Sequence, residues 1–154
     1  MNYRRGMPTD AEDIASLIAC FQNELTDDPS GAGAEQYLAS VTAEAERQYL
    51  QSDRYFYTVA IDGTGLAGFI AVRDISHVFR LFVAKTHQRH GLARQLWNLA
   101  STPEGPATAP SRYTVNSSLN AVPVYTAFGF VPASGITQVH GISFLPMQLT
   151  VAST

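Results

Sequence analysis

The amino-acid sequence predicts an α/β protein that forms one domain. Strand-like and helix-like segments alternate along the chain, and two strand-like segments are joined by the hairpin signal Asp62-Gly63. The chain has 154 residues, of which 45% are hydrophobic. A chain of this length buries roughly two thirds of its unfolded surface in one core. We therefore expect residues 1–154 to be a single domain.

The N-terminal third predicts one strand and two helices. Residues 2–7 favour a short strand, and Thr9-x-x-Glu12 has the pattern of a capping box that opens a helix. Residues 27–33, which contain one proline and two glycines, predict a break between the two helices. The buried stripes recur at helical spacing: Ile14, Leu17, Ile18, Phe21 and Leu25 in the first helix, and Tyr37, Leu38, Val41, Ala45 and Tyr49 in the second.

The remaining elements follow from β-forming runs and from proline positions. Residues 55–61 and 66–72 form the predicted hairpin, residues 77–83 a central strand, and residues 92–100 a third helix. Residues 101–110, with three prolines and one glycine, predict a loop. Pro123 is tolerated only in the first turn of a helix, so the last helix should begin at or after Asn120, a good N-cap residue.

The segment between the central strand and the third helix predicts an anion site. A helix N-terminus presents free backbone N–H groups, with the positive end of the helix dipole behind them. Basic side chains here add donors, and small residues leave room for phosphate oxygens near the amides, so the expected ligand is a phosphate or pyrophosphate. The candidate residues are Gln88, Arg89, His90, Gly91, Leu92, Ala93 and Arg94.

Other phosphate motifs are excluded by their spacing. The chain has no Gly-x-Gly-x-x-Gly after a strand and no Gly-x-x-x-x-Gly-Lys-Ser/Thr, so neither a Rossmann dinucleotide site nor a P-loop agrees with it. An ordinary strand-loop-helix connection uses residues similar to 88–94. The segment by itself leaves that alternative open.

A second motif, Tyr125-x-x-x-Gly129-Phe130, follows in the C-terminal third. Together with Gln88-x-x-Gly91-x-Ala93 it resembles the GNAT superfamily of acetyl-CoA-dependent N-acetyltransferases, in the order and spacing of that family. The resemblance covers nearly the whole chain. Residues 115–118, 125–130 and 141–147 also look like those of a set of small bacterial GNAT proteins.

That resemblance implies a mixed α+β sheet, mostly antiparallel, flanked by helices and splayed between its fourth and fifth strands. Acetyl-CoA would bind where these strands separate, with the backbone of Phe82 and Val83 pairing with pantetheine as an added strand does. Family members often carry an asparagine seven residues before the tyrosine; here that position is Ser118. Asn116 and Asn120 flank it, so each of the three is a candidate pantetheine contact.

The chemistry of acetyl transfer asks for two proton-handling groups. The attacking amine must lose a proton, although a free alkylamine has a pKa near ~10.4, and the departing thiolate needs a donor. Tyr125 suits the second role because a phenol pKa of ~10 lies near that of a thiol; the alternative is a packed helix tyrosine. His77 lies six residues before Val83, on the strand where several GNAT enzymes place a glutamate base. We expect it to be the base, with a structural hydrogen-bonding role as the alternative.

The acceptor is the least specified part of the reaction. The family implies that a primary amine on a small molecule or peptide enters opposite the cofactor, walled by residues 27–33 and the first two helices. Asp27, Asp28 and Glu35 are either solvated residues around a helix break or carboxylates that hold a second positive charge on the acceptor. If these carboxylates do not bind the acceptor, we expect Tyr55, Tyr57 and Phe79 to determine its specificity. A non-catalytic acyl-CoA-binding module is the alternative function, favoured by the lack of an acidic residue on the fourth strand.

Composition and charge narrow the partners. The net charge is −3, from ten Lys and Arg against thirteen Asp and Glu, so nucleic acid is not expected. No apolar run approaches the ~20 residues of a membrane span, and residues 1–6 lack the apolar core of a signal peptide, so we expect a cytoplasmic protein. A single cysteine, Cys20, agrees with a reducing compartment, and no pair of histidines has metal-ligand spacing, so no metal is expected. The oligomeric state is open, with a homodimer as one option.

Overall fold

The computed structural model describes residues 1–63, 65–102 and 109–151. Within them one mixed sheet has eight strands in the order β1-β2-β3-β4-β5-β8-β6, and β7 pairs with β8. All pairings are antiparallel except that of β4 with β5, which confirms the predicted α/β fold with a mostly antiparallel mixed sheet. The strands are β1 (Asn2–Arg5), β2 (Tyr55–Asp62), β3 (Gly65–Arg73), β4 (His77–Val83), β5 (Arg112–Ser118), β6 (Val131–Pro132), β7 (Thr137–Val139) and β8 (Ile142–Thr150).

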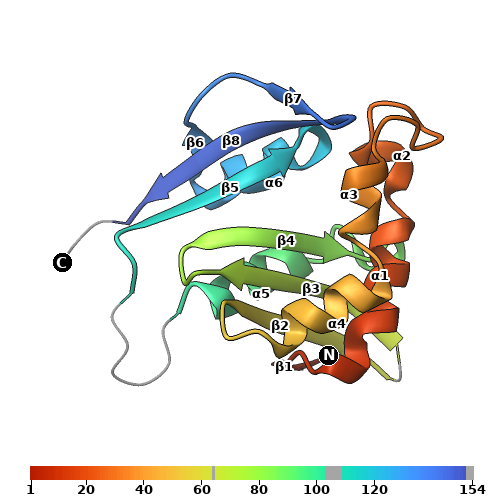
Figure 1. Cartoon of the computed structure of the whole chain (residues 1–154). Helices are drawn as coiled ribbons and strands as arrows, with labels where there is room; N and C mark the ends of the chain where they lie inside the picture. Colours follow the sequence, from red (N-terminus) through yellow and green to blue (C-terminus); the bar gives the residue numbers. More distant parts are fainter. Residues whose placement is uncertain (64, 103–108, 152–154) are drawn as a thin grey trace.

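Helices cover both faces of this sheet (Figure 1). On one face, α1 and α4 pack over β2 and β3. On the other, α5 packs under β2, β3 and β4, and α6 lies against β5. No helix among the described residues is long and apolar enough to cross a membrane. The helices are α1 (Ala11–Ala19), α2 (Gln22–Leu25), α3 (Glu35–Ala39), α4 (Ala43–Gln51), α5 (Leu92–Ala100) and α6 (Val122–Phe128).

The sheet is split between β4 and β5. These parallel strands pair only at the start of β4, where His77 pairs with Thr114 and Val78 with Val115. Beyond this point they diverge, and Figure 1 shows β5 and β8 tilted away from β4. The expected splay between the fourth and fifth strands is confirmed, and it leaves one edge of β4 without a strand partner.

The first predicted helix is interrupted, and its predicted capping box does not form. Phe21 leaves the helical region (φ −109°, ψ 10°) and ends α1, while its ring packs 5.5 Å from that of Phe82 on β4. The N-cap of α1 is Asp10, which makes no side-chain cap bond. Its carboxylate instead accepts the N–H of Met7 at 2.7 Å and pairs with Arg4 of β1. Contacts with two strands decide both features: Phe21 packs against β4, and Asp10 pairs with β1.

The second predicted helix is two helices, because Thr42 starts a new one. Its hydroxyl accepts the N–H of Ala45 at 3.1 Å, a side-chain cap for α4. The carbonyl of Ser40, just after α3, accepts the hydroxyl of Tyr49 and the guanidinium of Arg80. These bonds satisfy a helix end that would otherwise leave a polar group unpaired.

The last helix begins close to its predicted start but with a different cap. Asn120 lies in a 3-10 turn, Leu119–Ala121, and Ala121 is the N-cap of α6. The predicted cap at Asn120 is therefore wrong, while Pro123 does lie in the first turn. Most of the predicted loop 101–110 lies outside the described residues.

A buried ion pair joins α4 to β4. Glu46 is fully buried, and its carboxylate accepts Arg80 Nε at 2.9 Å and the Tyr57 hydroxyl at 2.5 Å. Burial raises the pKa of Glu46, and the charge of Arg80 opposes that rise. The guanidinium of Arg80 also lies 4.2 Å from the centre of the Phe79 ring. This network holds β4 from the side of the sheet that α4 covers.

Removing Glu46 should therefore destabilise the fold strongly. Glu46→Ala leaves the guanidinium of Arg80 buried without its counter-ion, which costs about 3–5 kcal/mol in comparable cases. Glu44→Ala is the matched control on the same helix: its side chain is 69% exposed, and loss of its pair with Arg47 should cost at most about 1 kcal/mol. Urea unfolding of both variants measures the difference. Equal losses would show that the buried pair contributes nothing beyond an exposed one.

Candidate active site

A cleft of about 770 Å³ lies where β4 and β5 separate. Its walls come from the end of β4, the loop that follows, the start of α5, the end of β5, α6 and α2. Segments that are far apart in the sequence therefore meet here. The lining residues are Phe21, Glu24, Leu25, Leu81, Phe82, Val83, Lys85, His87, Gln88, Arg89, Gly91, Leu92, Ala93, Arg94, Ser118, Asn120, Ala121, Val124 and Tyr125.

One wall of the cleft is the unpaired edge of β4. A β-bulge precedes it: Ala71 pairs with Arg80 but Val72 pairs with Val78, so Phe79 is an extra residue. Phe79 packs against Tyr49 of α4 while Arg80 bonds Glu46 of the same helix, so both side chains lie on one face of the sheet. Beyond the bulge, backbone groups of β4 face the cleft rather than another strand. Such groups are obligatory hydrogen-bonding partners for whatever fills the cleft.

The loop before α5 presents free backbone donors. Arg89 (φ 66°) and Gly91 (φ 79°) both adopt the left-handed conformation and turn the chain into the helix. The first N–H to bond back is that of Gln95, to the carbonyl of Gly91 at 3.0 Å. Within the described residues, the N–H groups of Leu92, Ala93 and Arg94 have no partner. Together with the helix dipole they form a turn that is able to bind an anion.

Gly91 is required by its conformation rather than by crowding from the protein. A Cβ added there would meet no described atom within 4 Å, but the left-handed region disfavours every other residue type. Gly91 lines the cleft. A bulky substitute would therefore take up space beside the free amides of the turn.

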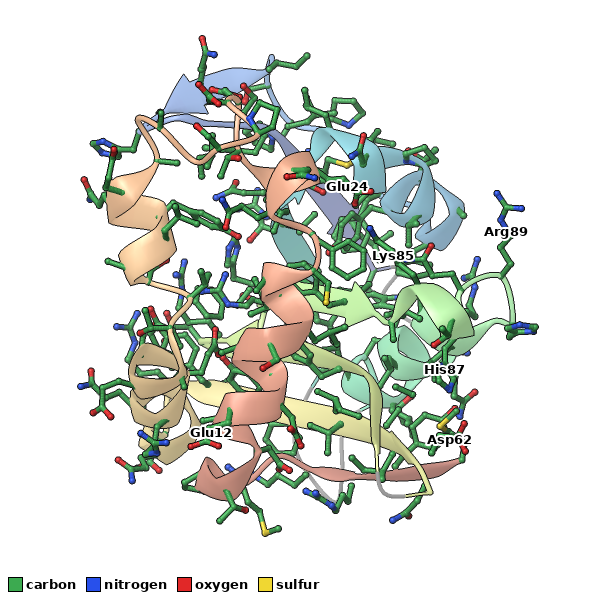
Figure 2. All side chains as sticks on the ribbon, turned by 90° about the vertical axis from the view of Figure 1, so that its right-hand side faces the viewer. Glu12, Glu24, Asp62, Lys85, His87 and Arg89 are labelled. Carbon is green, nitrogen blue, oxygen red and sulfur yellow. The ribbon has the colours of Figure 1, made fainter. Side chains whose placement is uncertain are left out.

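The basic side chains of the loop are divided between binding and structure. Arg89 is exposed, and Figure 2 shows it at the edge of the molecule, beyond Lys85 and His87. Arg94 donates from Nη2 to the carbonyl of Ala127 at 2.8 Å and lies over the Phe128 ring, so it also fastens α5 to α6. The Gln88 side chain donates to the carbonyl of Val83 at 3.1 Å, which ties the loop to the end of β4. His87 bonds Asp62 at 2.9 Å and connects the loop to the β2–β3 hairpin.

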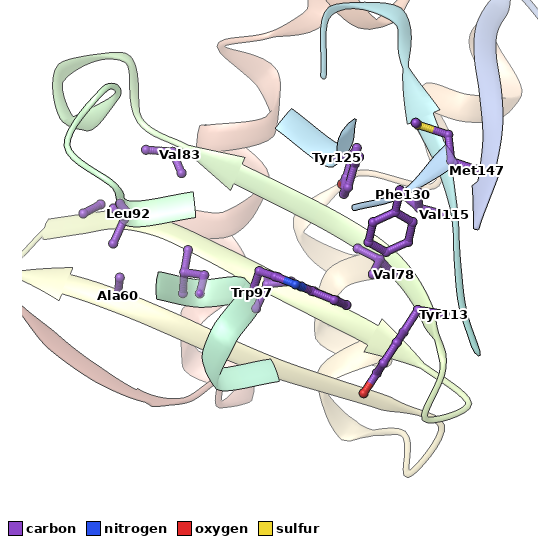
Figure 3. Close-up of a cluster of buried hydrophobic side chains, with 13 residues drawn as sticks. Ala60, Val78, Val83, Leu92, Trp97, Tyr113, Val115, Tyr125, Phe130 and Met147 are labelled. Atoms are coloured by element: carbon purple, nitrogen blue, oxygen red, sulfur yellow. The ribbon is translucent and has the colours of Figure 1, made fainter. Parts of the chain in front are cut away.

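Tyr125 has its ring in the core and its hydroxyl at the cleft. The residue is 4% exposed, and its ring packs edge-on against Phe130 (Figure 3) and against Phe128. Its hydroxyl has no hydrogen-bond partner among the described residues. Arg73 Nε is the only buried side-chain polar atom without a partner among those residues, so the Tyr125 hydroxyl is not enclosed but opens into the cleft it lines. Burial of the side chain raises its pKa, which keeps the phenol protonated.

Two of the three candidate pantetheine contacts line the cleft. Ser118 and Asn120 line it, at the end of β5 and before α6, whereas Asn116 is exposed and does not line it. His90 also lies elsewhere, in a neighbouring hollow of about 430 Å³ beside Met1 and Tyr3. The other predicted cofactor contacts, from Phe82 to Arg94, line the main cleft.

His77 lies at the closed end of the split rather than in the cleft. It is in the first residue pair of β4 with β5, and its Nδ1 is 2.8 Å from the hydroxyl of Thr114. Burial, and then the positive charge of Arg73, lower the pKa of His77, so the imidazole is neutral at neutral pH. It is not among the residues that line the main cleft.

Sequence reasoning missed the contribution of α2. Phe21, Glu24 and Leu25 line the cleft, but only the packing of α1 and α2 over β4 brings them there. Their helical spacing predicts that Phe21 and Leu25 belong to a buried stripe. Nothing in the spacing of Glu24 distinguishes it from other exposed helix residues. Lys85 and His87 also line the cleft. Their position next to the predicted anion loop is the sequence signal that could have identified them.

Comparison with known proteins agrees with this architecture. The structure resembles a GCN5-related N-acetyltransferase from Rhodopseudomonas palustris, with a TM-score of 0.75, 18% identity, and coverage of 97% of this chain and 95% of that one. It also resembles the PaiA N-acetyltransferase from Thermoplasma acidophilum in complex with coenzyme A (TM-score 0.67, 15% identity, coverage 97% and 98%). A third likeness is to an aminoglycoside 6'-N-acetyltransferase complexed with coenzyme A (TM-score 0.69, 13% identity, coverage 100% and 99%). At these identities the likeness shows the fold.

The family is shown by the sequence itself. No curated protein matches the chain. The model of the acetyltransferase (GNAT) domain, however, matches residues 25–151, which include the anion loop, β4, β5 and α6. The chain therefore belongs to the GNAT acetyltransferase family.

Proposed function

We propose that the protein transfers the acetyl group of acetyl-CoA to a primary amine, which attacks the thioester directly while both substrates are bound. The observation that carries the proposal is the cleft, which combines an unpaired strand edge, a turn of free backbone amides and one tyrosine hydroxyl. Each of these features is suited to bind or to act on a different part of acetyl-CoA. The coenzyme supplies an activated acetyl thioester, and the protein residues bind it and manage the protons.

The anion loop is suited to the pyrophosphate. The unpaired amides of Leu92 to Arg94 lie at the positive end of α5, on residues that line the cleft, and Lys85 and Arg89 add charge nearby. The edge of β4 at Phe82 and Val83 offers backbone groups to the amides of pantetheine, in the manner of an added strand. Ser118 and Asn120 supply side-chain donors and acceptors from the opposite wall.

Tyr125 is suited to the thiol leaving group. As the amine nitrogen bonds to the acetyl carbon, the carbon–sulfur bond breaks and negative charge collects on sulfur. A hydroxyl that stays protonated and opens into the cleft can donate to that sulfur and deliver its proton. Because burial raises the pKa of Tyr125, the phenolate formed would readily regain a proton.

Binding of acetyl-CoA tests the anion loop. Gly91→Glu places a carboxylate in front of the free amides and should lower affinity for acetyl-CoA by at least about tenfold, through charge repulsion and bulk. Gly63→Glu is the matched control, because Gly63 (φ 64°) is also left-handed with nothing described within 4 Å of a Cβ, yet does not line the cleft. Calorimetric titration of both folded variants measures the effect. Unchanged affinity in Gly91→Glu, or equal losses in both, would remove the loop from the binding site.

Turnover tests the tyrosine. Tyr125→Phe retains the ring and deletes the proton, so acetyl-CoA affinity should hold while kcat falls by roughly 10²-fold or more. Release of free thiol with a panel of amines is the measurement. A parallel loss of binding and turnover would indicate a packing role. Binding of acetyl-CoA by the wild type without thiol release for any amine would favour the alternative, a non-catalytic acyl-CoA-binding module.

The base is proposed to be His77, as the sequence predicts, acting on the amine directly or through water. Its neutral imidazole supports that role, and its place at the closed end of the split argues for a structural one. His77→Gln retains a partner for Thr114. If His77 is the base, the variant should lose turnover most near neutral pH and least at high pH, where the amine loses its proton unaided.

Stability against pH separates the structural role. The folded-state pKa of His77 is depressed, so its contribution to stability is present above about pH 6.5, the unfolded value, and is lost as pH falls through the folded value. His77→Gln should remove that acid-side loss. If this change appears while the pH–rate profile keeps its shape and height, His77 stabilises the fold and is not the base.

A further inference from the structure

The charges along the cleft are sorted by sign. Its basic residues, Lys85, Arg89 and Arg94, come from the loop and α5. Among the described residues that line the cleft, Glu24 of α2 is the only carboxylate. Figure 2 shows Glu24 on α2, above Lys85 and apart from the loop that carries Arg89. The cleft therefore has a cationic region and a single anionic group on a different element.

The neighbouring carboxylates are already engaged. Asp27 accepts Gln138 Nε2 at 2.9 Å and the Ser143 hydroxyl at 2.6 Å, which fastens the loop after α2 to β7 and β8. Asp28 accepts both the N–H and the hydroxyl of Ser30. Glu35 accepts the N–H of Gly33 at 3.2 Å. None of the three lines the cleft, so the acceptor role considered for them from the sequence has no support in their positions.

Glu24, by contrast, is exposed and lines the cleft. Within the described part of the chain its carboxylate has no hydrogen-bond or ion-pair partner. It is flanked by Phe21 and Leu25, apolar residues that line the same cleft. Lys85 approaches α2 with its Nζ 5.3 Å from the centre of the Phe21 ring, without pairing with Glu24. A carboxylate beside an apolar wall is a site for a cation with a hydrocarbon stem.

We propose that Glu24 binds a positive charge of the acceptor, and that this charge is not on the nitrogen that is acetylated. The inference rests on the proposed function. Acetyl-CoA is polyanionic, so a carboxylate opposes its binding, and Glu24 is better suited to the other substrate. A carboxylate acts as the base for an amine when burial brings its pKa toward neutrality. Glu24 is exposed, and an exposed carboxylate favours the ammonium form of a nitrogen that it contacts. The acceptor class is therefore a dibasic amine, with one amine attacked and a second ammonium or guanidinium held by Glu24.

The test compares a dibasic amine with a monoamine of the same chain length, in the wild type, Glu24→Gln and Glu12→Gln. Glu12 is the control because its side chain is 82% exposed on α1 and does not line the cleft. In the wild type and in Glu12→Gln, kcat/KM for the dibasic amine should exceed that for the monoamine by about fivefold, mostly through KM, as an exposed ion pair allows. The preference should shrink as salt is raised. In Glu24→Gln the ratio should fall to about one.

Three results would overturn the inference and leave the proposed function standing. The first is a wild type that releases thiol with monoamines and dibasic amines equally well. The second is a dibasic preference that persists in Glu24→Gln. The third is a Glu24→Gln change confined to the KM for acetyl-CoA, which would place Glu24 beside the coenzyme. Failure of the proposed function itself looks different, since no amine then releases thiol. Calorimetric titration of the dibasic amine into the protein with coenzyme A gives a readout that does not depend on turnover.

Discussion

The separation of β4 from β5 is the constraint on which the rest of the structure depends. After Val78 the edge of β4 has no strand beside it, although backbone N–H and C=O groups in a protein interior require partners. The protein satisfies part of this need itself, since Gln88 bonds the carbonyl of Val83. The remainder faces a cleft that is open to a ligand. An unpaired strand edge in the middle of a sheet is stable only because the elements on either side hold the two halves apart.

Two buried clusters hold the halves: one lies within the β1–β4 half, and the other joins that half to β5 and β8. The β1–β4 half is secured from the α1 and α4 face, where Glu46 pairs with Arg80 and Phe69 stacks between Tyr57 and Phe82. The β5 and β8 half is joined to the first half by aromatic packing around Trp97 of α5, which lies against Tyr113 and Phe130 (Figure 3) and also stacks on Phe128. A third tie runs from Asp27 to β7 and β8, so the loop after α2 reaches the far half of the sheet. The cleft therefore lies between rigid walls, which lowers the cost of ordering a bound ligand.

Much of the fold could be predicted from local pattern. The bounds of β4 and α5 agree with the periodicity of residues 77–83 and 92–100, because a central strand and an amphipathic helix carry strong signals. The hairpin of β2 and β3 follows from Asp62-Gly63, where Gly63 adopts φ 64°. The predictions that failed are helix ends. In place of the box at Thr9, Asp10 pairs with Arg4 of β1, and the helix breaks where Phe21 packs against Phe82 of β4. The N-cap of α6 is Ala121 instead of Asn120.

The sequence by itself determined the family, the anion turn at residues 88–94 and the tyrosine at 125, because each depends on short-range spacing along one strand, loop or helix. Only the tertiary structure decided which polar residues meet in the cleft. It brings Ser118 and Asn120 to the wall and leaves Asn116 outside, and it places His77 where the strands are still paired. It also adds Glu24, from a helix of four residues. The physical reason is that the cleft forms between two halves of a sheet held by packing between elements that are distant in sequence, and no local pattern encodes how they meet.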